Sequence, residues 1–433
     1  MSPELTGIIA TLILLGLFAS RMSIGLSMLA IGFLGYVYLA GASAGLAMVG
    51  MGLYTTARSY TLSVIPMFIL MGMFLSYSGL GYDIYQSVDT WMRHLRGGLA
   101  MATIGACAAF AAVSGSATAT AATIGAVALP EMKRYNYKDS LATACVAVGG
   151  TLGILIPPSA ILILYGILTE EPVGKLLIAG ILPGILQTAL FWVTSYLLVK
   201  RDPSLAPVRP SAAFGEKLAS LRKIWPVLVL FLLVMGGIYT GVSTPTEAAA
   251  IGAFGALIFS LATRRFSRKT FIKSLDQTAR TTAMLFLILI GAVIFSRFLA
   301  VTRIPLELCA FIAGLGISRY VVMALILLIL LFLGCFVEGI ALLALTAPII
   351  YPLIIDLGFD GIWFGVVMIV MLNMGMVTPP VGMNVYVTAG VAKDVPLMTI
   401  FHGVIPFLMA MIVCAILLVA FPQIATFLPN LMQ

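Results

Sequence analysis

The sequence predicts an all-α polytopic membrane protein built as an inverted repeat, in which each half has five spanning helices and one re-entrant hairpin. Three observations predict this fold class. First, 61% of the 433 residues are hydrophobic and only 9% are charged, with a mean hydropathy of +1.14. Second, short motifs of the first half recur in the second half. Third, glycine and proline interrupt the apolar runs at matching places in both halves.

The composition excludes a water-soluble fold, because a soluble domain carries about 25% charged residues. The longest polar stretch, Lys200–Lys223, is too short to form a core. A spanning helix needs roughly 17–25 apolar residues. No Lys or Arg precedes the first apolar run, so we expect a spanning helix there and not a cleaved signal. Runs near this length are Leu5–Ser20, Met22–Leu39, Leu177–Leu198, Trp225–Tyr239, Thr281–Phe298, Val321–Leu333 and Ile405–Phe421.

The basic residues predict which side of the membrane each loop faces. If the N-terminus lies outside, 19 of the 24 Lys and Arg residues fall on the cytoplasmic side, among them Arg21, Arg264 and Arg265. Cytoplasmic loops of membrane proteins are enriched in positive charge. We therefore predict ten crossings with both termini outside. The net charge of +8 comes from basic residues gathered on the cytoplasmic side, so it does not indicate nucleic-acid binding. The exceptions are Arg58, Lys175, Arg297, Arg303 and Arg319.

Motifs in the two halves match at a separation of 220 to 223 residues. Ala30–Gly35 recurs as Ala250–Gly255, and Gly180–Pro183 recurs as Gly403–Pro406. Five crossings per half place the second half upside down relative to the first. Inverted repeats are typical of secondary transporters. The predicted units are residues 1–200, a cytoplasmic linker over 201–222, and residues 223–433.

Each half contains one segment that leaves and re-enters on the same side, followed by a broken helix. The first hairpin covers about 98–132 with its tip at Ser114-Gly115-Ser116, and the second covers about 319–351 with its tip at Glu338-Gly339. Irregular backbone at membrane depth is tolerated only inside protein or beside a wet cavity. Matched breaks therefore indicate a transport site, although Gly and Pro also permit close helix packing. The breaks are Gly149–Pro158 and Asn373–Pro380.

Several motifs resemble those of the large membrane subunit of tripartite ATP-independent periplasmic (TRAP) transporters. One of them is Ser114–Gly125 (SGSATATAATIG), followed by Ala128–Met132. The resemblance spans nearly the whole chain. Other segments that carry it are Gly149–Ser159, Gly174–Gly180, Thr244–Ala249 and Asn373–Gly382.

This resemblance implies a multi-pass protein of the bacterial inner membrane with the architecture of an elevator-type ion transporter, in which a transport domain holding both hairpins moves against a scaffold. It also implies coupling to sodium, and a substrate that is an organic acid such as a C4-dicarboxylate or sialic acid. Two partners are implied as well. One is a small membrane subunit, expected as a separate chain, and the other is a periplasmic binding protein that delivers the substrate.

We predict two sodium sites at the helix breaks, where free carbonyls and hydroxyls provide the oxygen ligands that a hard cation prefers. The substrate is expected between the hairpin tips. Glu338 either binds an ion or a proton there or only caps a helix. The first sodium set is Ser114, Ser116, Gly150 and Thr151; the second is Gly339, Asn373, Met376 and Thr378; the substrate set is Ser114, Gly115, Ser116, Glu338, Gly339, Pro158 and Pro380.

Two other functions stay open at this point. One is a self-sufficient sodium/carboxylate symporter that needs no binding protein. The other is an intramembrane enzyme, which the sequence disfavours because it shows no nucleophile–base set and no metal-ligand spacing. The amphipathic pieces Tyr82–Arg96 and Phe271–Arg280 are expected to lie along the cytoplasmic interface as bracing arms.

Overall fold

The structure is a computed structural model that describes residues 2–20, 22–263, 266–314 and 316–432. Arg21, Arg264 and Arg265 of the charge distribution, and Gln433 of the second unit, lie outside these residues. All regular elements within the described ranges are helices, which confirms the all-α prediction. They are α1 (Pro3–Ala19), α2 (Ile24–Ala40), α3 (Ala42–Arg58), η1 (Tyr60–Ser63), α4 (Val64–Tyr77), α5 (Leu80–Met92), α6 (Gly98–Ser114), α7 (Ala117–Arg134), α8 (Asp139–Leu155), α9 (Ala160–Thr169), α10 (Val173–Ala179), α11 (Ile181–Arg201), η2 (Pro203–Leu205), α12 (Phe214–Tyr239), α13 (Pro245–Ala262), α14 (Arg268–Thr302), α15 (Ile304–Gly314), α16 (Arg319–Gly334), α17 (Gly339–Asp356), α18 (Gly361–Gly375), α19 (Met383–Ala392), α20 (Leu397–Ala420) and α21 (Gln423–Asn430).

The helices are long and apolar enough for a polytopic membrane protein. In the described part of the chain, seven helical segments qualify as membrane spans by length and composition, or eight if α8 and α9 form one span bent by 40°. Several other apolar helices, including α1, α2 and α16, are shorter than this limit. The prediction that the chain crosses the membrane many times is confirmed, and the exact number of ten stays a prediction.

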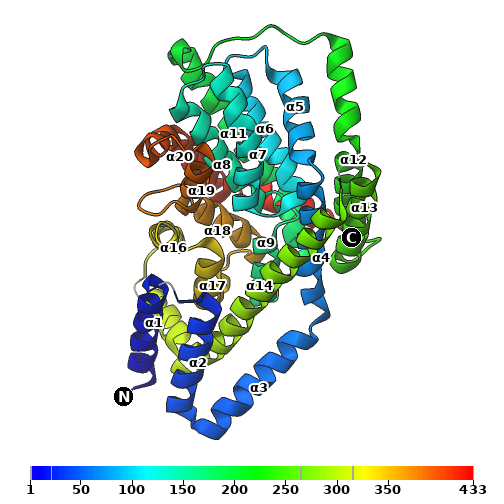
Figure 1. Cartoon of the computed structure of the whole chain (residues 1–433). Coiled ribbons are helices and arrows are strands. Elements are labelled where there is room, and N and C mark those ends of the chain that lie inside the picture. Colours follow the sequence, from blue (N-terminus) through cyan, green and yellow to red (C-terminus); the bar gives the residue numbers. More distant parts are fainter. Residues whose placement is uncertain (1, 21, 264–265, 315, 433) are drawn as a thin grey trace.

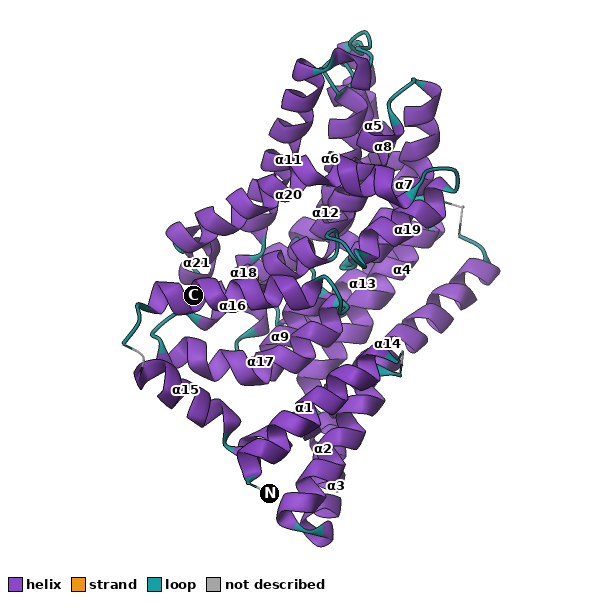
Figure 2. Cartoon of the chain, turned by 90° about the vertical axis from the view of Figure 1, so that its left-hand side faces the viewer, coloured by secondary structure: helices purple, strands orange, loops and turns teal. Residues whose placement is uncertain are grey.

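Two groups of packed helices position the site. In the first, α14 runs obliquely as a 35-residue helix, with α2 and α4 packed along it and α13 packed on α4 (Figure 1). We call α2, α4, α13 and α14 the frame. The second group contains α6–α9 and α16–α20 (Figure 2). Its centre is formed by α8 and α18, in which almost every residue from Leu141 to Leu155 and from Gly361 to Gly375 is buried.

The helix breaks predicted from glycine and proline are present in the second group, but they are shorter than expected. Gly149–Leu155 belong to α8 and Asn373–Gly375 to α18, so the glycines do not interrupt the helices, and the proline pairs do. Helices α6 and α7 meet at Gly115-Ser116, and α8 is separated from α9 by Ile156–Ser159. The second half repeats this order with α16 and α17, then α18 and α19. The Pro157-Pro158 and Pro379-Pro380 bonds are both cis. That α6–α7 and α16–α17 turn back inside a membrane stays a prediction.

A further expected boundary also differs from the structure. The segment Phe271–Arg280, expected as a separate interface arm, is part of the continuous helix α14. A helix of 35 residues is about 50 Å long, whereas the hydrocarbon core is about 30 Å thick. The charged segment is therefore the part of α14 that extends beyond the hydrocarbon core. The connection predicted at 201–222 contains η2 and the first turns of α12.

Candidate functional site

A cavity of about 490 Å³ lies between the frame and the two hairpin tips. The frame contributes residues of α4 and α14, and the second group contributes both tips and the start of α9. The polar side chains that line it are Ser114, Ser116, Thr118, Gln277, Thr281 and Glu338. None of the described lining residues is Lys or Arg.

The first tip is shaped by a glycine that no other residue could easily replace. Gly115 ends α6 with a φ of +61°, a left-handed conformation that favours glycine. A Cβ at Gly115 would lie 2.5 Å from the carbonyl oxygen of Pro158. The tip is therefore held directly against the break between α8 and α9.

Hydroxyl groups continue from this tip into α7. Ser116 is the N-cap of α7, and its Oγ accepts a hydrogen bond from the amide of Ala119 at 3.3 Å. The hydroxyls of Ser114 and Thr120 share a hydrogen bond of 2.7 Å. Thr120 is fully buried, and the sequence analysis did not select it. The local Thr-Ala-Thr alternation after the tip is a signal that could have identified it.

The second tip reaches the same place from the other half of the chain. Glu338 is partly buried at the N-cap position of α17 and lines the cavity with Gly339. A Cβ at Gly339 would lie 3.7 Å from Cδ1 of Ile161 and 3.9 Å from Sδ of Met376. Both tips therefore contact the start of α9, as expected for hairpins that meet.

Three helix N-termini face this cavity, those of α7, α9 and α17. Its lining includes Ala117, Ala160 and Gly339, the first residues of these helices. The first amide groups of a helix lack intrahelical partners and carry partial positive charge. Such ends bind anions. A carboxylate can therefore be bound in the cavity although no basic side chain lines it.

The predicted sites fall into two sets in the structure. Seven of the predicted residues line the cavity together, and the other five do not. Lining residues are Ser114, Gly115, Ser116, Pro158, Glu338, Gly339 and Met376; the residues outside the lining are Gly150, Thr151, Asn373, Thr378 and Pro380.

The five outside residues lie in the helices behind the tips or in the second break. A Cβ at Gly150 would lie 3.0 Å from the carbonyl oxygen of Ala117, so α8 passes close to the start of α7. The Thr151 hydroxyl donates to the carbonyl of Val148 and faces α11, where Nε2 of Gln187 approaches it at 3.4 Å. Thr378 donates to the carbonyl of Met374 at 2.6 Å, and Pro380 is exposed.

Two buried asparagines carry polar atoms without protein partners. Neither Oδ1 nor Nδ2 of Asn373 has a hydrogen-bond partner, and Oδ1 of Asn384 has none, within the described part of the chain. Nδ2 of Asn384 donates to the carbonyl of Ala147 in α8 at 3.1 Å, which joins the second break to the first half. Buried polar atoms are almost always paired, so these oxygens fit a cation or water. Asn384 was not predicted; an amide in the first turn of the helix that follows the Pro379-Pro380 break is the signal that could have identified it.

Two further site residues, Gln277 and Thr281, come from the frame. They lie one turn apart on α14 and both line the cavity. The sequence analysis missed Gln277 because it placed Phe271–Arg280 at the membrane surface. It missed Thr281 because nothing in the apolar run Thr281–Phe298 shows which helix that residue faces. The residues described in the structure contain no group of three or more His, Cys, Asp and Glu side chains that could hold a metal ion.

Comparison with known proteins identifies the family. Residues 11–424 match the family model of the tripartite ATP-independent periplasmic transporter, DctM component. A C4-dicarboxylate TRAP transporter large permease protein of Pseudomonas aeruginosa is 37% identical over 381 residues, covering 87% of this chain and 88% of that protein. A sialic acid TRAP transporter large permease protein of Vibrio cholerae is 32% identical over 418 residues, covering 96% of this chain and 97% of that protein.

A solved structure shares the fold. The YdaH transporter of Alcanivorax borkumensis aligns with a TM-score of 0.64 over 88% of this chain and 89% of that chain, at 14% sequence identity. The family match over residues 11–424 confirms the resemblance stated from the sequence. The chain belongs to the DctM component family of tripartite ATP-independent periplasmic transporters.

Proposed function

We propose that this chain imports an organic acid across the bacterial inner membrane, driven by a sodium gradient and supplied by a periplasmic binding protein. The observation that carries the proposal is the cavity between both hairpin tips and the frame. It combines three helix N-termini, which favour a carboxylate, with hydroxyl and amide groups that can bind the rest of a polar acid. C4-dicarboxylates and sialic acid, named in the relatives, are the first substrates to test.

The bound cations would supply the positive charge that the lining lacks. We place one sodium near the first tip, with Ser114, Ser116, Gly150 and Thr151, and a second near the second break, with Gly339, Asn373, Met376 and Thr378. The unpartnered Oδ1 of Asn373 supports the second site. The hydroxyl of Thr151 faces Gln187, and its carbonyl lies inside α8, where it accepts a helical hydrogen bond. This residue would therefore bind the first sodium only through the second lone pair of that carbonyl. A sodium beside each tip lowers the energy of a bound carboxylate.

The same geometry supports an elevator mechanism. The cavity has one wall in the frame and the other in the second group, so movement of one group past the other would expose it to one side and then to the other. In this movement, Glu338 would be the acidic side chain closest to the second sodium, which is proposed beside Gly339. A small membrane subunit is proposed to pack against the frame and hold it in place.

Uptake into proteoliposomes tests this function. The full chain is reconstituted with its small membrane subunit and its binding protein, and labelled C4-dicarboxylates and sialic acid are supplied outside. We expect uptake of one organic acid that requires both the binding protein and an inward sodium gradient. Uptake by the chain without a binding protein would instead support a self-sufficient symporter. Uptake that proceeds equally with choline in place of sodium would contradict the sodium assignment.

A further inference from the structure

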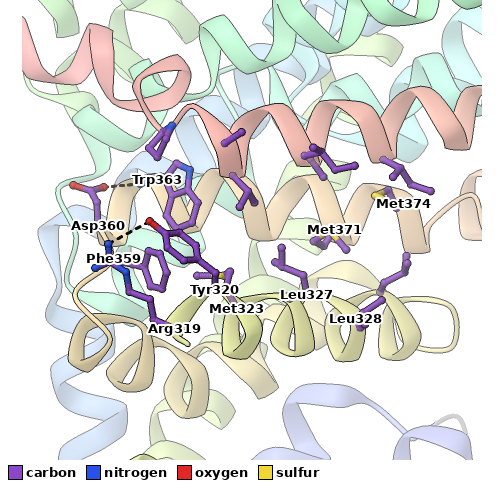
Figure 3. Close-up of a pocket in the computed structure, with 18 of the residues that line it drawn as sticks. Arg319, Tyr320, Met323, Leu327, Leu328, Phe359, Asp360, Trp363, Met371 and Met374 are labelled. Carbon is purple, nitrogen blue, oxygen red and sulfur yellow. Dashed lines mark hydrogen bonds between the residues drawn. The ribbon is translucent and has the colours of Figure 1, made fainter. Parts of the chain in front are cut away.

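A second hollow lies away from the transport cavity, between α16, α18 and α20 (Figure 3). It has a volume of about 910 Å³ and shares no lining residue with that cavity. We call it the Arg319 groove, after the residue at its polar end. Its other walls consist of Tyr320, Met323, Ala324, Leu327, Leu328 and Leu331 of α16, residues 358–360, Trp363, Met371 and Met374 of α18, Ile412, Ala415, Ile416, Val419 and Ala420 of α20, and Pro422.

The groove is deep, apolar and open along one side. Met323, Trp363 and Met374 form a floor in which each residue is at most 2% exposed. Leu328 and Ile416 stand on its rim and are 61% and 60% exposed. Methionine side chains adapt to flexible apolar partners. In a membrane, a groove of this kind faces lipid along its open side.

The dimensions of the groove fit an acyl chain better than a helix. From Arg319 to Leu331 the α16 wall rises about 18 Å, at 1.5 Å per residue. This is close to the depth of one leaflet, about half of the 30 Å hydrocarbon core. A volume of about 910 Å³ over this length gives a cross-section of about 50 Å². An α-helix with side chains is about 10–12 Å wide, roughly twice that cross-section.

Charged groups of both signs gather at one end of the groove. The Arg319 guanidinium lies 5.1 Å from the ring centre of Tyr320 and 5.3 Å from that of Phe359. Within the described residues Arg319 makes no ion pair. Asp360 lies at the same end, where one of its oxygens accepts the amide hydrogen of Trp363 at 2.7 Å (Figure 3). Aromatic side chains gather at the level of the lipid headgroups in membrane proteins.

We propose that the Arg319 groove binds a zwitterionic phospholipid, with an acyl chain along the methionine-rich floor, the phosphate on Arg319 and the headgroup ammonium facing Asp360. The guanidinium donates one hydrogen bond to the Tyr320 hydroxyl at 3.3 Å (Figure 3), and its remaining N–H groups complement a phosphate. The neighbouring carboxylate complements an ammonium and repels a headgroup with only negative charge. Phosphatidylethanolamine has both groups, and phosphatidylglycerol has only the anion.

Native mass spectrometry of the purified full chain tests the headgroup assignment. The protein in mild detergent is mixed with phosphatidylethanolamine or phosphatidylglycerol and then washed. We expect one retained phosphatidylethanolamine per chain and several times less phosphatidylglycerol. Arg319→Gln should reduce retention about tenfold, because a charge-assisted hydrogen bond is lost. Lys175→Gln, which removes an exposed basic residue outside the groove, should leave retention unchanged.

A second pair of variants tests the place of binding. Ala324 lines the groove from an exposed position on α16, so Ala324→Trp should fill the groove and exclude the lipid. Ala250→Trp, at an exposed position on α13 outside the groove, should retain the lipid. Melting temperatures show whether both variants are folded. Equal retention by the wild type, Ala324→Trp and Arg319→Gln would overturn the proposal, and equal retention of the two phospholipids would overturn the role of Asp360.

A fluorescence measurement gives a readout at the groove itself. Trp363 lies in its floor, and the other three tryptophans, Trp91, Trp192 and Trp225, do not line it. In a variant with those three replaced by Phe, phosphatidylethanolamine with brominated acyl chains should quench Trp363 at about one lipid per chain. An absence of quenching at that ratio would contradict an acyl chain on the groove floor.

Discussion

The Ser116→Ala variant separates the proposed sodium ligand from the helix cap, because Ser116 holds both positions. As the N-cap of α7, its hydroxyl accepts the amide of Ala119. Loss of an N-cap costs about 1 kcal/mol of stability. As a ligand, the same hydroxyl would contribute about 1 kcal/mol to sodium binding, similar to a neutral hydrogen bond. We therefore expect about a fivefold increase in the sodium concentration that half-saturates the protein.

Sodium binding can be measured without knowing the substrate. A cation that binds only the folded state raises the melting temperature as its concentration increases. The purified full chain is melted over a series of sodium concentrations, with choline keeping the ionic strength constant. Ser116→Ala should melt at a lower temperature and need about five times more sodium for the same half-maximal stabilisation.

Thr244→Ala provides the matched control. Thr244 is the N-cap of α13, in a capping box with Glu247, and it is exposed and outside the cavity. This variant should lose a similar amount of stability through its cap and keep the wild-type dependence on sodium. If Ser116→Ala behaves in the same way as Thr244→Ala, the assignment of Ser116 as a sodium ligand is wrong.

Three further predictions address other parts of the account. Thr281→Val removes a hydroxyl that lines the cavity and should raise the substrate concentration for half-maximal uptake several-fold. Thr282→Val, outside the lining, should leave this concentration unchanged, and equal effects of the two variants would contradict a substrate contact from α14. Arg209 pairs with Asp89 and lies over the ring of Tyr135 at 4.4 Å, and burial raises the pKa of the Asp89 carboxyl although Arg209 opposes this. Arg209→Gln should therefore destabilise the fold by about 1–3 kcal/mol near pH 7.5. The loss should shrink as the pH falls and Asp89 takes up a proton; a melting-temperature difference that does not depend on pH would argue against this cause. Reporters fused within Pro203–Phe214 and after the C-terminus should report a cytoplasmic loop and an external end, and a cytoplasmic C-terminus would refute the ten-crossing topology.

Local chemistry explains why the tips and breaks could be predicted from the sequence. Gly115 and Ser116 have strong positional preferences, one for a left-handed helix end and the other for an N-cap. A Pro-Pro pair cannot continue a helix. These preferences depend on a few neighbouring residues and therefore appear in a single sequence.

The frame wall of the cavity could not be predicted in the same way. Gln277 and Thr281 lie beside the tips only because α14 continues through its charged segment and crosses next to α4. That placement depends on packing between helices far apart in the chain. Thr151 is a similar case, because helix rotation turns its hydroxyl toward Gln187 in α11 and away from the tip. Helical periodicity gives the spacing of side chains on one helix and does not say which neighbour each face contacts.

The central claim is that the hairpin tips carry the substrate past a stationary frame, and cysteine cross-linking between the two groups tests it most directly. In a background without native cysteines, one cysteine replaces Thr118 at the first tip and another replaces Gln277 of α14, two residues that line opposite walls of the cavity. A control pair replaces Phe74 and Ser260, which are joined within the frame by a 3.1 Å hydrogen bond from the Ser260 hydroxyl to the Phe74 carbonyl. We predict that the tip-to-frame pair cross-links in only one of the inward- and outward-facing states, while the control pair cross-links in both. Equal cross-linking of the tip-to-frame pair in the two states would contradict the elevator account and favour a fixed site with rocking helices.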